Sequence, residues 1–154
     1  MAAKKNLQKL IESGRLKKEA NIGFDQIQKR IQRARQDLAS AQVLLKTDNN
    51  GAFQTAYDVM RQAGLSLVFS YGHRPAVSGF HKIVVEACSE ILGSDFEVII
   101  RRFDQARQQR HQAIYDDLQL TDSEAASSIK LAQDIIDLMI KTIRENNPQL
   151  ELFK

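Results

Sequence analysis

The chain has 154 residues, 43% of them hydrophobic and 27% charged, which predicts one globular domain spanning 1–154. Its only cysteine, Cys88, excludes an intrachain disulfide and a thiolate metal cluster. The sequence has no long apolar run, so we expect neither a signal peptide nor a membrane span. We therefore expect a cytoplasmic protein. The net charge of +3 is uneven: residues 1–46 hold 11 Lys and Arg against 4 Asp and Glu, so this third can attract phosphate backbones or can form solvated helix faces.

The first third predicts a short helix, a connector and a long helix. Residues 3–13 place Leu7 and Leu10 on one side, and Gly14 is suited to end this helix. We expect residues 14–23 to form a loosely packed connector. From 24 to 46, apolar residues recur every three or four positions, which is the period of a helix with one face toward a core. They are Ile27, Ile31, Ala34, Leu38, Ala41 and Leu44.

The middle third predicts two more helices. After a turn at 48–51, residues 52–71 have a wide apolar face in which Ala63 and Gly64 leave room for a neighbouring helix. Gly72 is suited to end this helix. A fourth helix is expected at 79–92, with Ser78 as its N-cap and Gly93 after its end.

The last third predicts two long helices, each opened by a capping box. Ser94-x-x-Glu97 opens a helix that runs to about 114, and Thr121-x-x-Glu124 opens a helix that runs to about 145. Residues 146–154 are expected to be a tail. The whole pattern is all-α and favours an up-and-down bundle of about five to six helices.

One helix surface carries residues suited to chemistry on phosphate. Arg107, Arg110, His111 and Tyr115 follow helical spacing, and Asp104 lies three residues before the first of them. Arginine matches phosphate oxygens, and histidine can exchange a proton near neutral pH, so such a set can cleave a phosphodiester without a metal. Alternatively, Arg107 pairs with Asp104, the cations complement the helix dipole, and Tyr115 simply packs.

Other charged residues add fewer expectations. Lys29 and Arg33 lie off the apolar stripe of their helix, and we count them with Arg107 and Arg110 as nucleic-acid-binding candidates. We expect His81 to be a structural histidine near a loop. No cluster of His, Asp and Glu has metal-ligand spacing, so neither a metal nor a cofactor is expected.

The chain resembles the HEPN family, helical proteins named for higher eukaryotes and prokaryotes nucleotide-binding. Segments in matching order carry the resemblance: Glu12–Lys18, Ala56–Ala63, Gly72–Pro75 with Gly79–His81, and above all RQQRHQAIYD at 107–116. The ribonuclease members of this family carry Arg, a polar residue, a short spacer and then His.

The resemblance implies a helical bundle that forms a homodimer, with facing motifs that cleave RNA without a metal. Arg110 takes the arginine position and His111 the polar position, whereas Tyr115 stands where the catalytic His is expected. A phenol with a pKa near ~10 is a poor base at neutral pH. His111 would therefore transfer protons beside Arg107 and Arg110, or the surface binds without cleaving.

Three functions follow as hypotheses. The first is an RNA-directed protein, a metal-independent endoribonuclease or a toxin-like component of a defence module with a nucleotidyltransferase-type antitoxin. The second is a non-catalytic module whose same surface binds a nucleotide, a nucleic acid or such a partner. The third is a structural bundle whose basic first third makes transient contacts.

Overall fold

The computed structural model describes residues 2–76 and 80–148, with side chains described from Leu7 onward. The described elements are α1 (Ala2–Glu12), β1 (Leu16–Lys18), α2 (Phe24–Leu44), α3 (Asn49–Ser70), β2 (His73–Pro75), α4 (Phe80–Leu92), η1 (Ser94–Phe96), α5 (Glu97–Tyr115) and α6 (Asp122–Asn146). This is the all-α bundle that the helical periods predict, with a two-stranded sheet added.

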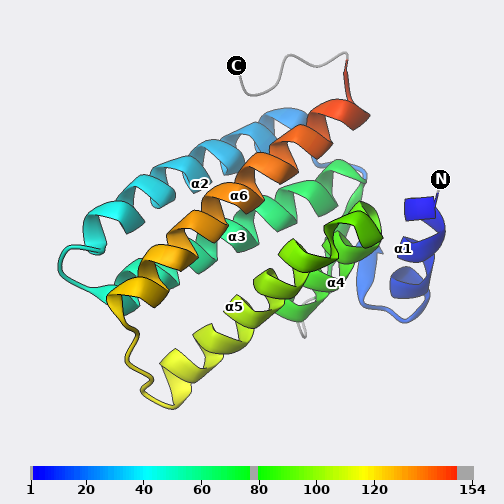
Figure 1. Cartoon of the computed structure of the whole chain (residues 1–154). Helices are drawn as coiled ribbons and strands as arrows, with labels where there is room; N and C mark the ends of the chain where they lie inside the picture. Colours follow the sequence, from blue (N-terminus) through cyan, green and yellow to red (C-terminus); the bar gives the residue numbers. More distant parts are fainter. Residues whose placement is uncertain (1, 77–79, 149–154) are drawn as a thin grey trace.

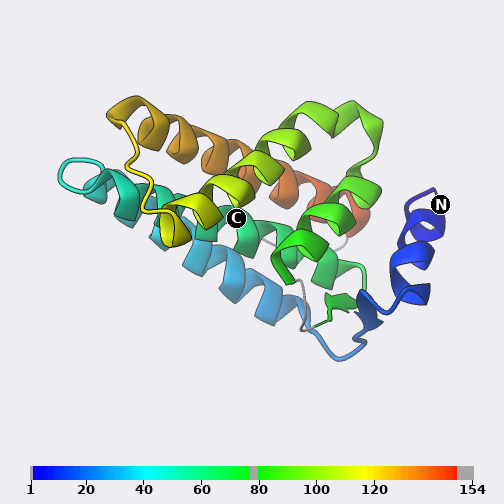
Figure 2. The same cartoon turned by 90° about the horizontal axis from the view of Figure 1, so that it is seen from below.

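The bundle is built around α3. Helices α2 and α6 lie along α3, while α4 and α5 pack on it from another side (Figures 1 and 2). The α3 sequence explains this position, because all residues from Gln62 to Val68 are buried. A helix that is buried on several faces must have helices around it. The largest fully buried side chains include Tyr57, Phe53 and Phe103.

A close contact at Gly64 joins α3 to α4 and α5. A Cβ added there would lie 3.0 Å from Val84 Cγ1 and 3.2 Å from both Cys88 Sγ and Phe103 Cε2. The Cys88 thiol also donates a hydrogen bond of 3.4 Å to the Gly64 carbonyl oxygen. The expectation that a helix approaches at this small residue is confirmed.

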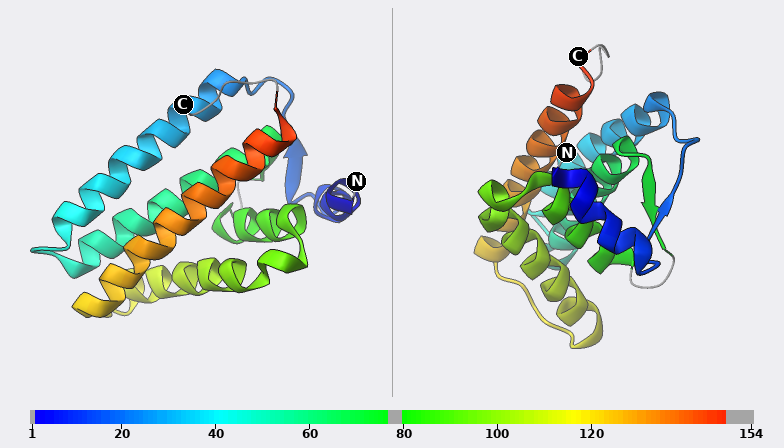
Figure 3. Two further views of the ribbon diagram at one scale, coloured as in Figure 1. Left: turned by 45° about the horizontal axis from the view of Figure 1, so that its top comes forward. Right: turned by 90° about the vertical axis from the view of Figure 1, so that its right-hand side faces the viewer.

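The prediction of a loosely packed connector at 14–23 is wrong for its middle residues. Residues 16–18 form β1, which pairs antiparallel with β2 so that Leu16 lies opposite Pro75. Leu16 is only 1% exposed, Arg15 forms an ion pair with Glu86, and α1 packs on α4 (Figure 3). Three residues are too few to show strand alternation, so the sequence pattern did not reveal this pairing.

The helix ends agree with the predicted stops better than with the predicted starts. Gly14 and Gly72 adopt φ values of 77° and 76°, the left-handed conformation that ends a helix. Thr121 and Glu124 form the expected capping box. The helix expected from 52 begins at Asn49 instead, because the Asp48 side chain accepts from the Gly51 amide at 2.9 Å and caps the helix earlier.

The capping box predicted at Ser94 is absent. Residues 94–96 form η1, and α5 starts after Phe96 without a side-chain cap. The tight turn places Ser94 before the helix rather than at its first turn, so its hydroxyl does not serve the α5 amides. The N-cap predicted at Ser78 and most of the predicted tail fall outside the described residues.

Among the described residues, no helix combines the length and the apolar character needed to cross a membrane.

Candidate phosphate-binding surface

The inward face of α5 changes from apolar to basic along its length. Ile100, Phe103, Arg107 and Arg110 follow one another at spacings of three and four residues, so they share a helix face. The first two are buried in the core, whereas both arginines are half-buried. The core-facing side of α5 therefore presents guanidinium groups to α3 near its C-terminal end.

Arg110 lies over the ring of Tyr57 on α3. Its Cζ is 5.6 Å from the ring centroid, within the range of a cation–π contact. Among the described residues, no carboxylate lies within ion-pair distance of Arg110, so the ring is its main partner.

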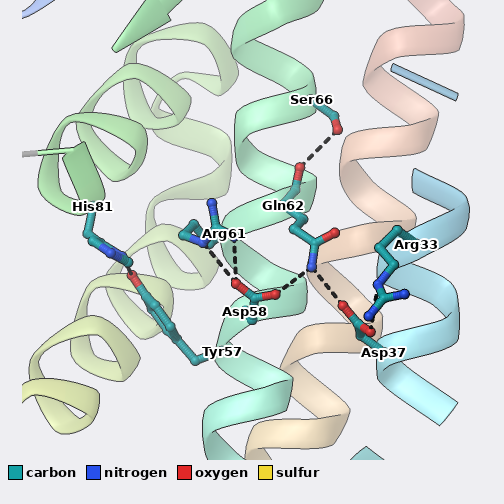
Figure 4. Close-up of polar contacts among 8 residues, drawn as sticks. All are labelled: Arg33, Asp37, Tyr57, Asp58, Arg61, Gln62, Ser66 and His81. Carbon is teal, nitrogen blue, oxygen red and sulfur yellow. Dashed lines mark hydrogen bonds and ion pairs between the residues drawn. The ribbon is translucent and has the colours of Figure 1, made fainter. Parts of the chain in front are cut away.

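Tyr57 also joins His81, which lies near the start of α4. The Tyr57 hydroxyl is 3.0 Å from His81 Nδ1, and the two rings stack with centroids 5.7 Å apart (Figure 4). Burial raises the pKa of Tyr57 to about 12, so the phenol keeps its proton at neutral pH. Burial, and then the charge of Arg110, lower the pKa of His81, so the neutral imidazole predominates at pH 7.

The direction of the hydrogen bond between Tyr57 and His81 determines whether Nε2 of the neutral imidazole is a donor or an acceptor. If the Tyr57 hydroxyl donates to Nδ1, then Nε2 carries the hydrogen and can donate to an anion. If Nδ1 carries the hydrogen and donates to the Tyr57 oxygen, Nε2 can accept a proton. The first tautomer suits binding of a phosphate, and the second suits removal of a hydroxyl proton.

Arg61 adds a third guanidinium beside His81. Its Nε and Nη2 donate to Asp58 Oδ1 at 2.9 and 2.6 Å, and its Cζ lies 5.9 Å from the centroid of the Phe80 ring. The charge of Arg61 contributes to the lowered pKa of His81. The charges of Arg61 on α3 and of Arg107 and Arg110 on α5 thus all lower the pKa of His81 on α4.

Arg107 forms the ion pair with Asp104 that their spacing of three residues allows. Its Nε donates to Asp104 Oδ1 at 2.8 Å. Burial raises the pKa of Asp104, but hydrogen bonds from Arg107 and Gln108 outweigh it and hold that pKa below its ordinary value. The charge of Arg107 still reaches Tyr57 and His81, where it lowers both pKa values.

His111 and Tyr115 lie apart from this cluster. Their ring centroids are 4.5 Å from each other, and Tyr115 is 70% exposed. One helical residue corresponds to about 100° of rotation, so His111 points well away from Arg110. The four residues of the predicted stripe therefore divide into an inward arginine pair and an outward aromatic pair.

The two candidates on α2, Arg33 and Lys29, also lie in different surroundings. Arg33 forms an ion pair of 3.2 Å with Asp37, and Asp37 accepts a 2.9 Å hydrogen bond from Gln62 Nε2. The same amide donates to Asp58, so these contacts connect α2 to the surface beside His81 (Figure 4). Lys29 is exposed, and it lies on the side of α2 that faces away from the apolar stripe.

Sequence reasoning missed Tyr57 and Arg61 and gave His81 only a structural role. One available signal was the series Ile100, Phe103, Arg107, Arg110, in which arginines occupy positions where a core helix usually carries apolar residues. The contacts of Tyr57 with both His81 and Arg110 depend on helix packing, so spacing along the chain could not reveal them.

No group of three or more metal-ligating side chains gathers within the described ranges. Cys88 is fully buried, and burial raises the pKa of its thiol to about 12. It is therefore a packing residue and not a nucleophile.

The all-α bundle built around α3 defines a class of protein, and the comparison with protein families agrees with this fold. The model of the HEPN domain matches residues 27–143, so the chain belongs to the HEPN family. The matched region excludes α1 and β1. Neither the curated proteins nor the solved structures contain a match to this chain.

Proposed function

We propose that this HEPN-domain protein acts on RNA and binds its phosphates through Arg107 and Arg110 beside His81. The position of Arg110 carries the proposal: it is a half-buried cation, held over Tyr57, with no carboxylate partner among the described residues. A desolvated cation is costly unless an anion pairs with it. Phosphate matches the planar fork of a guanidinium, and an RNA strand supplies it repeatedly.

Cleavage by the same surface is a second candidate, favoured by the lowered pKa of His81. In the tautomer with a free Nε2 lone pair, the imidazole takes the proton of a 2′-hydroxyl while the 2′-oxygen attacks the adjacent phosphorus. The bond to the 5′-oxygen breaks, that oxygen takes a proton from water, and His81 afterwards releases its proton to solvent. The products are a 2′,3′-cyclic phosphate and a 5′-hydroxyl end, and the arginines stabilise the charge that gathers on the phosphate.

His111 is the rival proton acceptor, because it is exposed and follows Arg110 directly. If neither histidine supports cleavage, the surface fits a non-catalytic module that binds a nucleotide, a nucleic acid or a nucleotidyltransferase-type partner. A homodimer with facing motifs, a toxin-like role and a nucleotidyltransferase-type antitoxin are proposals supported by membership of the family alone.

The binding proposal is tested with labelled single-stranded RNA in EDTA, comparing wild type with Arg110→Ala and Arg102→Ala. Arg102 is an exposed arginine of the same helix, so it controls for loss of one positive charge on α5. We expect Arg110→Ala to weaken binding about tenfold or more and Arg102→Ala to change it little. Equal affinities for all three proteins would contradict the proposed site.

The cleavage candidate is tested by incubating the same RNA with His81→Ala and His111→Ala and analysing the ends of any products. Loss of cyclic-phosphate products in His81→Ala alone assigns the proton acceptor to His81. Loss in His111→Ala alone assigns it to His111. RNA that stays intact with wild type while binding depends on Arg110 leaves a binding module and rejects the endoribonuclease.

A further inference from the structure

We propose that a second phosphate-binding position lies at Arg30 and Arg61, so that the ligand is an RNA strand crossing α3 from Arg110 to Arg30 and not a mononucleotide. This inference rests on the proposed function and extends the candidate surface to α2.

Arg30 is held in the same way as Arg110. Its Cζ lies 5.2 Å from the centroid of the Phe69 ring, and the residue is half-buried. In the part of the chain that the structure describes, no carboxylate lies within ion-pair distance of it. Burial of an arginine without a counter-anion is unfavourable, and binding of an anion removes that cost.

A neighbouring cation strengthens this argument. Burial, and after it the charge of Arg61, lower the pKa of Arg30, while Asp58 acts in the opposite direction. Arginine nevertheless stays protonated at neutral pH. Two like charges that influence each other on one surface are stabilised when an anion lies between them, and a phosphate can accept hydrogen bonds from both.

The acidic groups nearby are already engaged. Asp58 accepts from Arg61 and from Gln62, and Asp37 accepts from Gln62 and pairs with Arg33. Gln62 is only 4% exposed, so its amide holds both carboxylates from within the helix packing. Figure 4 shows Asp58 and Arg61 between the His81–Tyr57 pair and the contacts that reach α2. These carboxylates therefore orient Arg33 and Arg61, and among the described residues none of them forms an ion pair with Arg30.

Three arginine–aromatic pairs mark a path along α3. They are Arg110 with Tyr57, Arg61 with Phe80, and Arg30 with Phe69. Tyr57 and Phe69 are 12 residues apart on one helix, which corresponds to roughly 18 Å at about 1.5 Å per residue. A stacked strand advances about 3.4 Å per nucleotide, so this path accommodates about five nucleotides and is too long for one.

The path is tested by measuring the affinity of oligouridylates, from two to about ten nucleotides long, for wild type and for Arg30→Met and Arg35→Met. Methionine keeps apolar contact with Phe69 but removes the charge. Arg35 is the matched control, because it is an exposed arginine of the same helix that belongs to none of the candidate positions. We expect wild-type affinity to rise up to about five nucleotides, Arg30→Met to lose that rise, and Arg35→Met to keep it.

Salt dependence gives a second readout. Loss of one phosphate contact reduces the slope of log affinity against log salt by about 0.7 for a single strand, and we expect this change in Arg30→Met but not in Arg35→Met. Arg30→Lys keeps the positive charge, so it distinguishes loss of the charge from a change in the fold. If its affinity recovers partly relative to Arg30→Met at equal thermal stability, the contact is electrostatic.

The failures of the two proposals are distinguishable. If Arg110→Ala weakens binding but Arg30→Met matches wild type at every length, the second position is wrong and the first stands. If uridine monophosphate binds as tightly as the oligomers, the strand path is also wrong. If wild type binds none of these RNAs, both proposals are overturned.

Discussion

Arg110 occupies a position on α5 where the same helix face, two turns earlier, places Phe103 in the core. The chain accepts a cation there because the Tyr57 ring provides an aromatic face and because the site is only half-buried. Near it, His81 is kept neutral by burial and by the surrounding arginines. The chemistry of the surface thus depends on individual side chains that the packing of α3, α4 and α5 brings together.

The protonation of His81 gives a prediction at this scale. Its pKa in the folded protein is lowered, so the unfolded state binds more protons, and folding stability falls as pH drops below the ordinary histidine pKa of about 6.5. We expect Arg110→Ala to raise the His81 pKa, because it removes a cation, and Arg102→Ala to leave it unchanged. NMR titration of the imidazole protons measures both, and a lower pKa in Arg110→Ala would contradict the assigned contact.

Helix α3 organises the molecule at the scale of elements. It contacts α2, α4, α5 and α6, and it carries Tyr57, Asp58 and Arg61 on the side where the candidate surface lies. Such a helix needs a place where neighbours can approach its backbone, and Gly64 provides it against Val84 and Phe103. The distance between α3 and α5, and with it the contact of Arg110 with Tyr57, depends on this small residue.

Gly64→Ala is therefore expected to destabilise the fold, although alanine favours helix. The added Cβ would meet three neighbours at 3.0 to 3.2 Å, and overpacking of this kind costs about 1–3 kcal/mol. The gain in helix propensity is about 1 kcal/mol, so we expect a net loss of up to about 2 kcal/mol in urea unfolding. Ala39→Gly, in an exposed part of α2, measures the propensity contribution alone. An increase in stability with Gly64→Ala would show that the neighbours move apart freely.

The amino-terminal arm joins the bundle at the scale of the whole molecule. The family match begins at residue 27, yet α1 packs on α4 and β1 pairs with β2. Leu7, Leu10 and Leu16 are all buried in the common core. The arm is thus packed against the matched region, and it fixes the strand that precedes α4 and His81.

Removing the anchor of the arm is expected to destabilise the whole molecule. Leu16→Ala should lower the free energy of unfolding by about 2–5 kcal/mol, because it leaves a cavity under the sheet. Lys17→Ala is the control, since this neighbouring side chain is exposed. Chemical denaturation followed by circular dichroism measures both variants. Equal stability of Leu16→Ala and wild type would mean that the arm is not part of the cooperative core.

The sequence by itself determined the helices of the bundle and most of their ends. Helical period, glycine stops and the Thr121 capping box are local features, so neighbouring residues suffice to specify them. The same locality explains the errors: the pairing of Leu16 with Pro75 joins distant segments, and Ser94 has the capping pattern but precedes a tight turn. A local sequence pattern cannot distinguish a paired strand from a connector, or a capping residue from a residue before a tight turn.

Only the tertiary structure decided which side chains share the candidate surface. The motif at 107–116 directed attention to α5, and spacing grouped Arg107, Arg110, His111 and Tyr115 as one stripe. Packing against Tyr57 turns Arg110 inward, while His111 and Tyr115 stay outside. The contacts that join Arg110 and His81 through Tyr57, and α2 to α3 through Gln62, span 24 residues or more of chain. Such contacts arise from the arrangement of whole helices, which no local period encodes.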